Sequence, residues 1–66
     1  MEVFIATAKK VPEVGKTFDC CKVMSNHGYP YGIEVTTSIV REVRNIRPDM
    51  YGVITMNSIY VVNVSK

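Results

Sequence analysis

The chain has 66 residues, of which 47% are hydrophobic and 21% are charged, and its formal net charge is +2. This is ordinary globular composition, which excludes wholesale disorder, and so small a net charge does not by itself indicate a nucleic-acid binder. We expect one domain over residues 1–66, close to the lower size limit at which a hydrophobic core alone stabilises a fold.

Short strands separated by polar loops are predicted along the first half of the chain. Residues 2–8 form the first expected strand, which ends at a pair of lysines, and residues 17–24 form the second. Residues 25–32 combine glycine, proline and asparagine, a composition that is typical of a loop. Helical periodicity is nearly absent from this half of the chain.

Residues 33–46 are ambiguous between strand and helix. Their apolar side chains recur at one-turn spacing, and Pro48 would end a helix soon afterwards. However, β-branched residues dominate the segment, and such residues lose rotamer freedom in a helix. We therefore predict a long strand that is bent or bulged near residues 38–41, with a short helix over residues 37–46 as the alternative.

A closing hairpin is predicted from two β-branched runs that are separated by Asn57 and Ser58. This turn would place Ile54 opposite Val61. Both faces of the hairpin are then apolar. One face carries Ile54, Met56, Ile59 and Val61, and the other carries Tyr51, Val53, Tyr60, Val62 and Val64.

The predicted fold is all-β, either a small curled antiparallel sheet or a barrel of about five strands like an SH3 or OB fold. Because only one face of the last hairpin can line the core, the other is expected to mediate a symmetric homo-oligomer, most simply a dimer. We assign this role to the face with the tyrosines, since a tyrosine can bury its ring and keep its hydroxyl hydrogen-bonded at a subunit boundary. A closed barrel that buries both faces is the alternative.

Cys20 and Cys21 are adjacent, so on a strand they point to opposite faces and are badly placed for a disulfide bond. This favours a cytoplasmic setting. Together with His27 they are too few for a tetrahedral zinc site within one chain, so we expect no metal or other cofactor. No nucleophile, base and oxyanion-stabilising motif is recognisable, and we therefore predict that the chain is not an enzyme.

The stretch "NHGYPYG" is the best candidate for a binding site. Tyr29 and Tyr31 flank Pro30 on what is expected to be a semi-rigid loop, with His27 nearby. Such aromatic side chains bind protein surfaces or stack on bases. The alternative is that both tyrosines fold back over the end of the core.

A cationic cluster is formed by Arg41, Arg44 and Arg47. Guanidinium groups at this spacing could contact an anion or a phosphate. The alternative is a solvated strand edge whose charges prevent edge-to-edge aggregation.

The second half of the chain resembles short proteins of phages and prophages, on the strength of "TTSIVREVR" followed by "GVITMNSIYVVNV". The resemblance implies an accessory protein of a mobile element, which would act by binding in the host cytoplasm. We predict a non-catalytic binding protein that inhibits a host defence or regulatory system, by binding a host protein or by sequestering a nucleotide-like signal. A small SH3/OB-like nucleic-acid-binding protein is the alternative, and no membrane association is expected.

Overall fold

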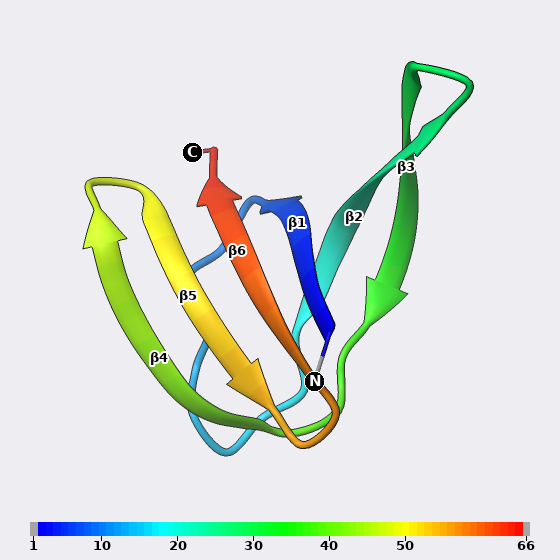
Figure 1. Ribbon diagram of the computed structural model, residues 1–66. Coiled ribbons are helices and arrows are strands. Elements are labelled where there is room, and N and C mark those ends of the chain that lie inside the picture. Colours follow the sequence, from blue (N-terminus) through cyan, green and yellow to red (C-terminus); the bar gives the residue numbers. More distant parts are fainter. Residues whose placement is uncertain (1, 66) are drawn as a thin grey trace.

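The computed structural model describes residues 2–65. Within that range it contains six β-strands and no helix: β1 (Glu2–Ala8), β2 (Asp19–Asn26), β3 (Tyr29–Thr36), β4 (Val40–Arg47), β5 (Met50–Thr55) and β6 (Ser58–Val64). The strands form a single sheet in the order β3-β2-β1-β6-β5-β4 (Figure 1). The predicted all-β class is confirmed, and the six strands of the described range agree with the predicted number of about five, but their sheet is not closed into a barrel.

The centre of the sheet is a parallel pair made by the first and last strands. β1 and β6 run side by side from Glu2 opposite Ser58 to Ala8 opposite Val64. All other neighbouring strands are antiparallel. The sheet is therefore mixed and not wholly antiparallel as predicted, because the two ends of the chain meet at its middle.

The segment predicted as a loop over residues 25–32 is instead a tight hairpin between β2 and β3. His27 and Gly28 have φ angles of +51° and +82°, and Asn26 lies opposite Tyr29. Positive φ at both central residues is characteristic of a type I′ turn, whose twist matches that of the flanking strands. Pro30 fits within β3 because β3 is an edge strand, where a missing N–H need not break a pairing.

Residues 33–46 form neither one bent strand nor a helix. The chain leaves the sheet between β3 and β4, which lie at opposite edges of the sheet. Thr37 holds this crossing in place, because its N–H donates to the Phe18 carbonyl at 2.8 Å and its Oγ1 accepts the Phe18 N–H at 3.2 Å. β4 itself is bulged between Val40 and Glu42, so an irregularity does occur near the predicted place.

The last hairpin differs from the predicted register. Ile54 lies opposite Ile59 rather than Val61, so the turn spans residues 55–58. Thr55 closes it, because its Oγ1 accepts the Ser58 N–H at 3.2 Å and donates to the Ser58 carbonyl at 3.1 Å. The partner of Ile54 is thus shifted by an even number of residues, and such a shift leaves every side chain of the hairpin on its expected face.

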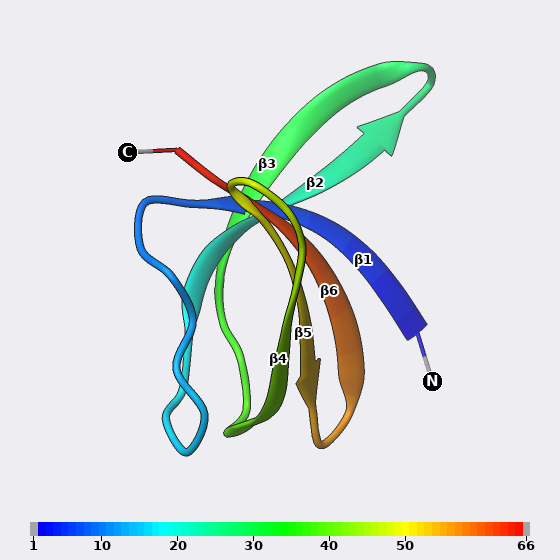
Figure 2. The ribbon, with the colours of Figure 1, turned by 90° about the vertical axis from the view of Figure 1, so that its left-hand side faces the viewer.

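The core lies on the face that carries the tyrosines, which reverses the predicted assignment. Val53 and Val62 are 0% exposed, and Tyr60, Val64 and the half-buried Tyr51 pack with them. These residues are buried within the chain because the β1–β2 loop and the base of β2 and β3 curl over this side of the sheet (Figure 2). The opposite, outer face carries Ile54, Ile59 and Val61.

The β1–β2 loop is tied to the start of β4. The Gly15 N–H donates to the Val40 carbonyl at 2.8 Å, and the Val40 N–H donates to the Lys16 carbonyl at 2.9 Å. The loop thereby covers the core, and its own Pro12 and Phe18 are buried. In Figure 1 this loop passes behind β4 and β5, so the view looks onto the outer face of those strands.

Candidate binding surfaces

The β2–β3 hairpin projects beyond the rest of the molecule (Figure 2). Near its tip Tyr29 is 77% exposed and Tyr31 is 44% exposed, and His27 occupies the turn. The tyrosines therefore lie on an extended strand in solvent, and they do not fold back over the core. The sequence predicted these tyrosines on a loop, whereas both lie exposed on strand β3.

An apolar surface continues from this tip toward the core along one side of the hairpin. Tyr31 lies opposite Met24, and Ile33 lies opposite Lys22. The Lys22 ammonium lies over the Phe4 ring at 3.8 Å from its centroid, and the Phe4 and Tyr60 ring centroids are 5.6 Å apart. We call this the hairpin surface, defined by Phe4, Lys22, Met24, Tyr29, Tyr31 and Ile33.

The three arginines lie on β4, at the opposite edge of the sheet from Tyr29 and Tyr31. All three are exposed, and the Arg44 Nε is paired with the Glu42 carboxylate. Arg41 lies at one of the two bulges of the strand. The structure therefore does not bring the arginines and the tyrosines into one site.

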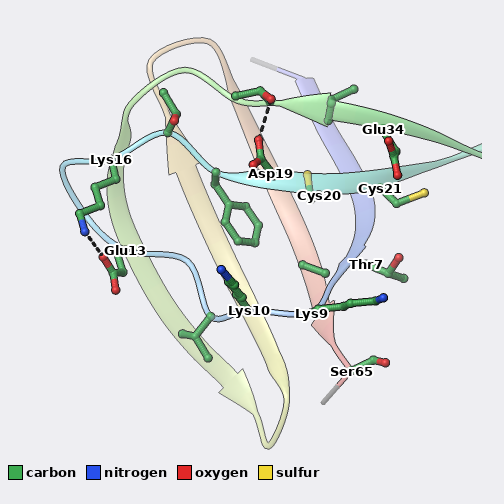
Figure 3. Close-up of a pocket in the computed structure, with 16 residues that line it drawn as sticks. Thr7, Lys9, Lys10, Glu13, Lys16, Asp19, Cys20, Cys21, Glu34 and Ser65 are labelled. Carbon is green, nitrogen blue, oxygen red and sulfur yellow. Dashed lines mark hydrogen bonds and ion pairs between the residues drawn. The ribbon is translucent and has the colours of Figure 1, made fainter.

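A groove of about 1100 Å³ lies under the β1–β2 loop (Figure 3). Lys9 and Lys10 line one side of it, Cys21 on β2 and Glu34 on β3 contribute to the lining, and so does Phe18. Within residues 2–65 neither Lys9 nor Lys10 has an ion-pair partner. Sequence reasoning missed this site, although a polar connection between two strands with three lysines was a signal that could have revealed it.

Three other charged side chains of the groove, those of Glu13, Lys16 and Asp19, have partners. Lys16 Nζ lies 2.9 Å from the Glu13 carboxylate, and this bond lowers the pKa of Glu13 and raises the pKa of Lys16. Thr36 Oγ1 donates to the Asp19 carboxylate at 2.6 Å. The groove is thus bordered by two free ammonium groups on the loop, and its acidic side chains partly offset them.

Cys20 and Cys21 point to opposite faces of β2, as expected for neighbours on a strand. Cys20 belongs to the core, and burial raises the pKa of its thiol, with smaller contributions from Cys21 and Asp19. Cys21 is half-buried and reaches the groove. Within the described range, no three side chains of histidine, cysteine, aspartate or glutamate cluster closely enough to share a metal ion.

The outer face of the sheet carries a continuous aliphatic patch. Val23, Ile5 and Val61 lie opposite one another across β2, β1 and β6, and Val3, Ile59 and Ile54 form the next row. Ile46 Cδ1 covers Gly52, since a Cβ at that glycine would lie 3.5 Å from it. We call this the outer patch, defined by Val3, Ile5, Val23, Ile46, Ile54, Ile59 and Val61.

No protein-family model, no curated protein and no solved structure matches the chain. In the part of the chain that the structure describes, no helix is long and apolar enough to span a membrane.

Proposed function

We propose that this chain is a non-catalytic binding protein whose hairpin surface holds a protein partner. The observation that carries the proposal is the projecting β2–β3 hairpin, which exposes 77% of Tyr29 outside the core (Figure 2). Tyrosine supplies a large and rigid contact area at low conformational cost, and it is enriched where proteins meet. Met24 and Ile33 extend the apolar contact on the same side of the hairpin.

The biological setting of the proposal rests on the resemblance of the second half of the chain to short phage and prophage proteins. It makes the chain a mobile-element accessory protein in the host cytoplasm, where it would inhibit a defence or regulatory protein by occupying its surface. Such an inhibitor needs affinity and no chemistry, which agrees with a hairpin that offers aromatic contacts and no nucleophile beside a base.

The test is affinity capture from a bacterial lysate with three forms of the chain. The wild type should retain one host protein in stoichiometric amount, and the double variant Tyr29→Ala, Tyr31→Ala should lose it. The matched control is Val14→Ala, because Val14 is also a large exposed side chain, at 61%, but lies in the β1–β2 loop. Capture that survives the double variant, or no stoichiometric capture by the wild type, would refute the proposal.

The same proposal has a small-molecule form, in which the groove under the β1–β2 loop sequesters a nucleotide-like signal. Its size suits a ligand of that class, and Lys9 and Lys10 offer ammonium groups for phosphate oxygens. Mass spectrometry of the nucleotides released from protein purified out of its host cell tests this form. The double variant Lys9→Ala, Lys10→Ala should release none, whereas the tyrosine variant should release as much as the wild type.

A nucleic-acid-binding function is the second candidate, and it is favoured by the ammonium of Lys22 over the Phe4 ring, on the surface that also carries Tyr31. Alternating aromatic and basic side chains bind single strands through stacking and phosphate contacts. Fluorescence anisotropy with a single-stranded oligonucleotide at 50 and 200 mM salt tests it, because phosphate contacts release counterions and weaken steeply with salt. Salt-independent or absent binding would exclude this candidate.

A further inference from the structure

The outer patch is exposed to a degree that is unusual for the face of a sheet. Val3 is 61% exposed, Ile5 is 58% exposed and Ile46 is 52% exposed. Val3 and Ile5 lie in the two aliphatic rows, which cross the middle of the sheet without a charged side chain between them, and Ile46 covers Gly52, which lies opposite Val61. A contiguous apolar patch of this kind marks an interaction site in soluble proteins.

None of the described segments covers this patch. The β1–β2 loop lies behind the sheet in Figure 1, and the core fills the space between them. The turned view shows the loop on one side of the sheet and the N-terminal strand β1 at the border of the other (Figure 2). The face therefore needs a covering surface from outside residues 2–65.

The edges of the sheet are poor places for association, which leaves the face. β4 is bulged at two places and carries three arginines, and β3 carries Pro30. Bulges, charges and proline on edge strands all oppose the addition of a further strand. Face-to-face stacking of two sheets, by contrast, requires apolar side chains that alternate along the strands, as they do in the outer patch.

We infer that the outer patch packs against the same patch of a second copy of this chain, with a twofold axis that runs along β1 and β6. A third row of side chains on the outer face supports pairing with a second copy. It begins with Glu34 on β3 and ends with Arg47 on β4, with Cys21, Thr7, Asn63 and Met50 between them. A twofold axis along the central strands turns one sheet edge toward the opposite edge of its copy. It therefore brings the acidic end of each row to the basic end of the other.

The dimensions of the molecule fit such a pair. Its extents are 35 × 25 × 17 Å, so a broad face accommodates the roughly 800 Å² per partner that a standard specific interface buries. Association about a twofold axis buries the outer patches of both copies in one contact, so neither patch stays exposed to solvent. It also adds apolar burial to a chain that is too short to have a large core.

This dimer is independent of the protein-binding function proposed for the hairpin surface. Tyr31 and Ile33 lie on the core side of the sheet, because they pair with Met24 and Lys22 in register with Ala6. The hairpin surface therefore stays open when the outer patch is covered. Dimerisation without capture of a host protein would refute the proposed function alone. Capture of a host protein by a monomeric wild type would refute the dimer alone.

Light scattering at 100 µM tests the inference. The wild type should have twice the molecular mass of a single chain, which is 7.4 kDa. Ile5→Glu should be monomeric with an unchanged far-ultraviolet spectrum, because Ile5 lies at the centre of the patch and its side chain does not belong to the core. The matched control is Val14→Glu, which introduces the same charge at an exposed loop residue and should remain dimeric. A monomeric wild type, or a dimeric Ile5→Glu, would overturn the inference.

Charge reversal tests the axis. Glu34→Arg and Arg47→Glu should each raise the dimer dissociation constant about five-fold, since each places like charges across the interface. The double variant should return the constant to the wild-type value, because the pair is then restored with its signs exchanged. Additive weakening in the double variant would overturn this arrangement of the two copies.

Discussion

The thiol of Cys21 occupies the space where a side chain at residue 32 would begin: a Cβ added to Gly32 would lie 2.5 Å from Cys21 Sγ. Cys21 pairs with Glu34, and Gly32 pairs with Val23, so the sulfur leans diagonally across the β2–β3 ladder. Gly32 has no positive φ. Space, and not backbone conformation, is therefore what excludes a larger residue at this position.

Gly32→Ala is expected to lower the free energy of unfolding by about 1–3 kcal/mol, because the new methyl group overlaps the thiol. In a Cys21→Ala background the same substitution should be neutral or stabilising by about 0.5–1 kcal/mol, since alanine loses less backbone entropy than glycine in a strand. Urea denaturation of the four members of this double-mutant cycle measures the coupling. Additive effects of the two substitutions would show that the contact does not constrain residue 32.

The buried hydroxyl of Thr55 stabilises the last turn, because it bonds both the N–H and the carbonyl of Ser58 while the side chain is only 2% exposed. Thr55→Val keeps the shape but leaves these groups without their partner, and we expect a loss of about 1–3 kcal/mol of stability. Thr55→Ser keeps the hydroxyl and removes one methyl group, so it should cost less than Thr55→Val. Thermal unfolding ranks the two variants, and the reverse order would contradict this role.

The last hairpin shows where the sequence is informative and where it is not. Its alternation predicted the two faces correctly, even with the register wrong, because side chains repeat every two residues. Both faces are apolar, however, and the choice between them depends on where the β1–β2 loop crosses the sheet. That loop is tied to Val40, far along the chain, and no local pattern indicates such a contact. The parallel pairing of β1 and β6 was missed for the same reason.

The candidate site was predicted in part. Tyr29 and Tyr31 were selected because they flank a proline, and they are exposed, but the density of glycine, proline and asparagine suggested a loop. The dipeptide His27-Gly28 is a turn signal that could have predicted the hairpin, since histidine tolerates positive φ better than most residues. The arginines were grouped by sequence spacing alone, and Arg44 pairs with a neighbouring glutamate on its own strand.

The thiol of Cys20 should make the protein less stable in alkali. Burial raises its pKa above the ordinary value of 9.0. Below pH 9.0 the thiol is protonated in both the folded and the unfolded chain, so its contribution to stability is fully present. As the pH rises further the unfolded chain loses this proton first, and the contribution is lost as the pH passes through the folded-state pKa. Melting temperatures between pH 8 and pH 11 should fall more steeply for the wild type than for Cys20→Ala.

Alkylation with iodoacetamide gives a second measurement of the same burial. In the variant Ile5→Glu, which has no dimer partner over its outer face, the half-buried Cys21 should react first, whereas Cys20 in the core should react only as the chain opens. Peptide mass spectrometry assigns each product. Equal rates for the two thiols in the folded protein would contradict the position of Cys20.

His27 and Asp49 are the two non-glycine residues of the described range that have a positive φ angle, and that of Asp49 is +64°. Asp49 follows Pro48 in the turn between β4 and β5, where Arg47 lies opposite Met50, and this combination is that of a type II turn. Asp49→Gly should be neutral or stabilising, and Asp49→Val should cost about 1–2 kcal/mol, because a β-branched side chain clashes with its own backbone at positive φ.

Asn63 is the matched control, since it is exposed within β6 and valine suits a strand better than glycine there. Melting temperatures should therefore rank glycine above valine at residue 49 and valine above glycine at residue 63. The same order at both positions would show that the turn does not require the left-handed conformation.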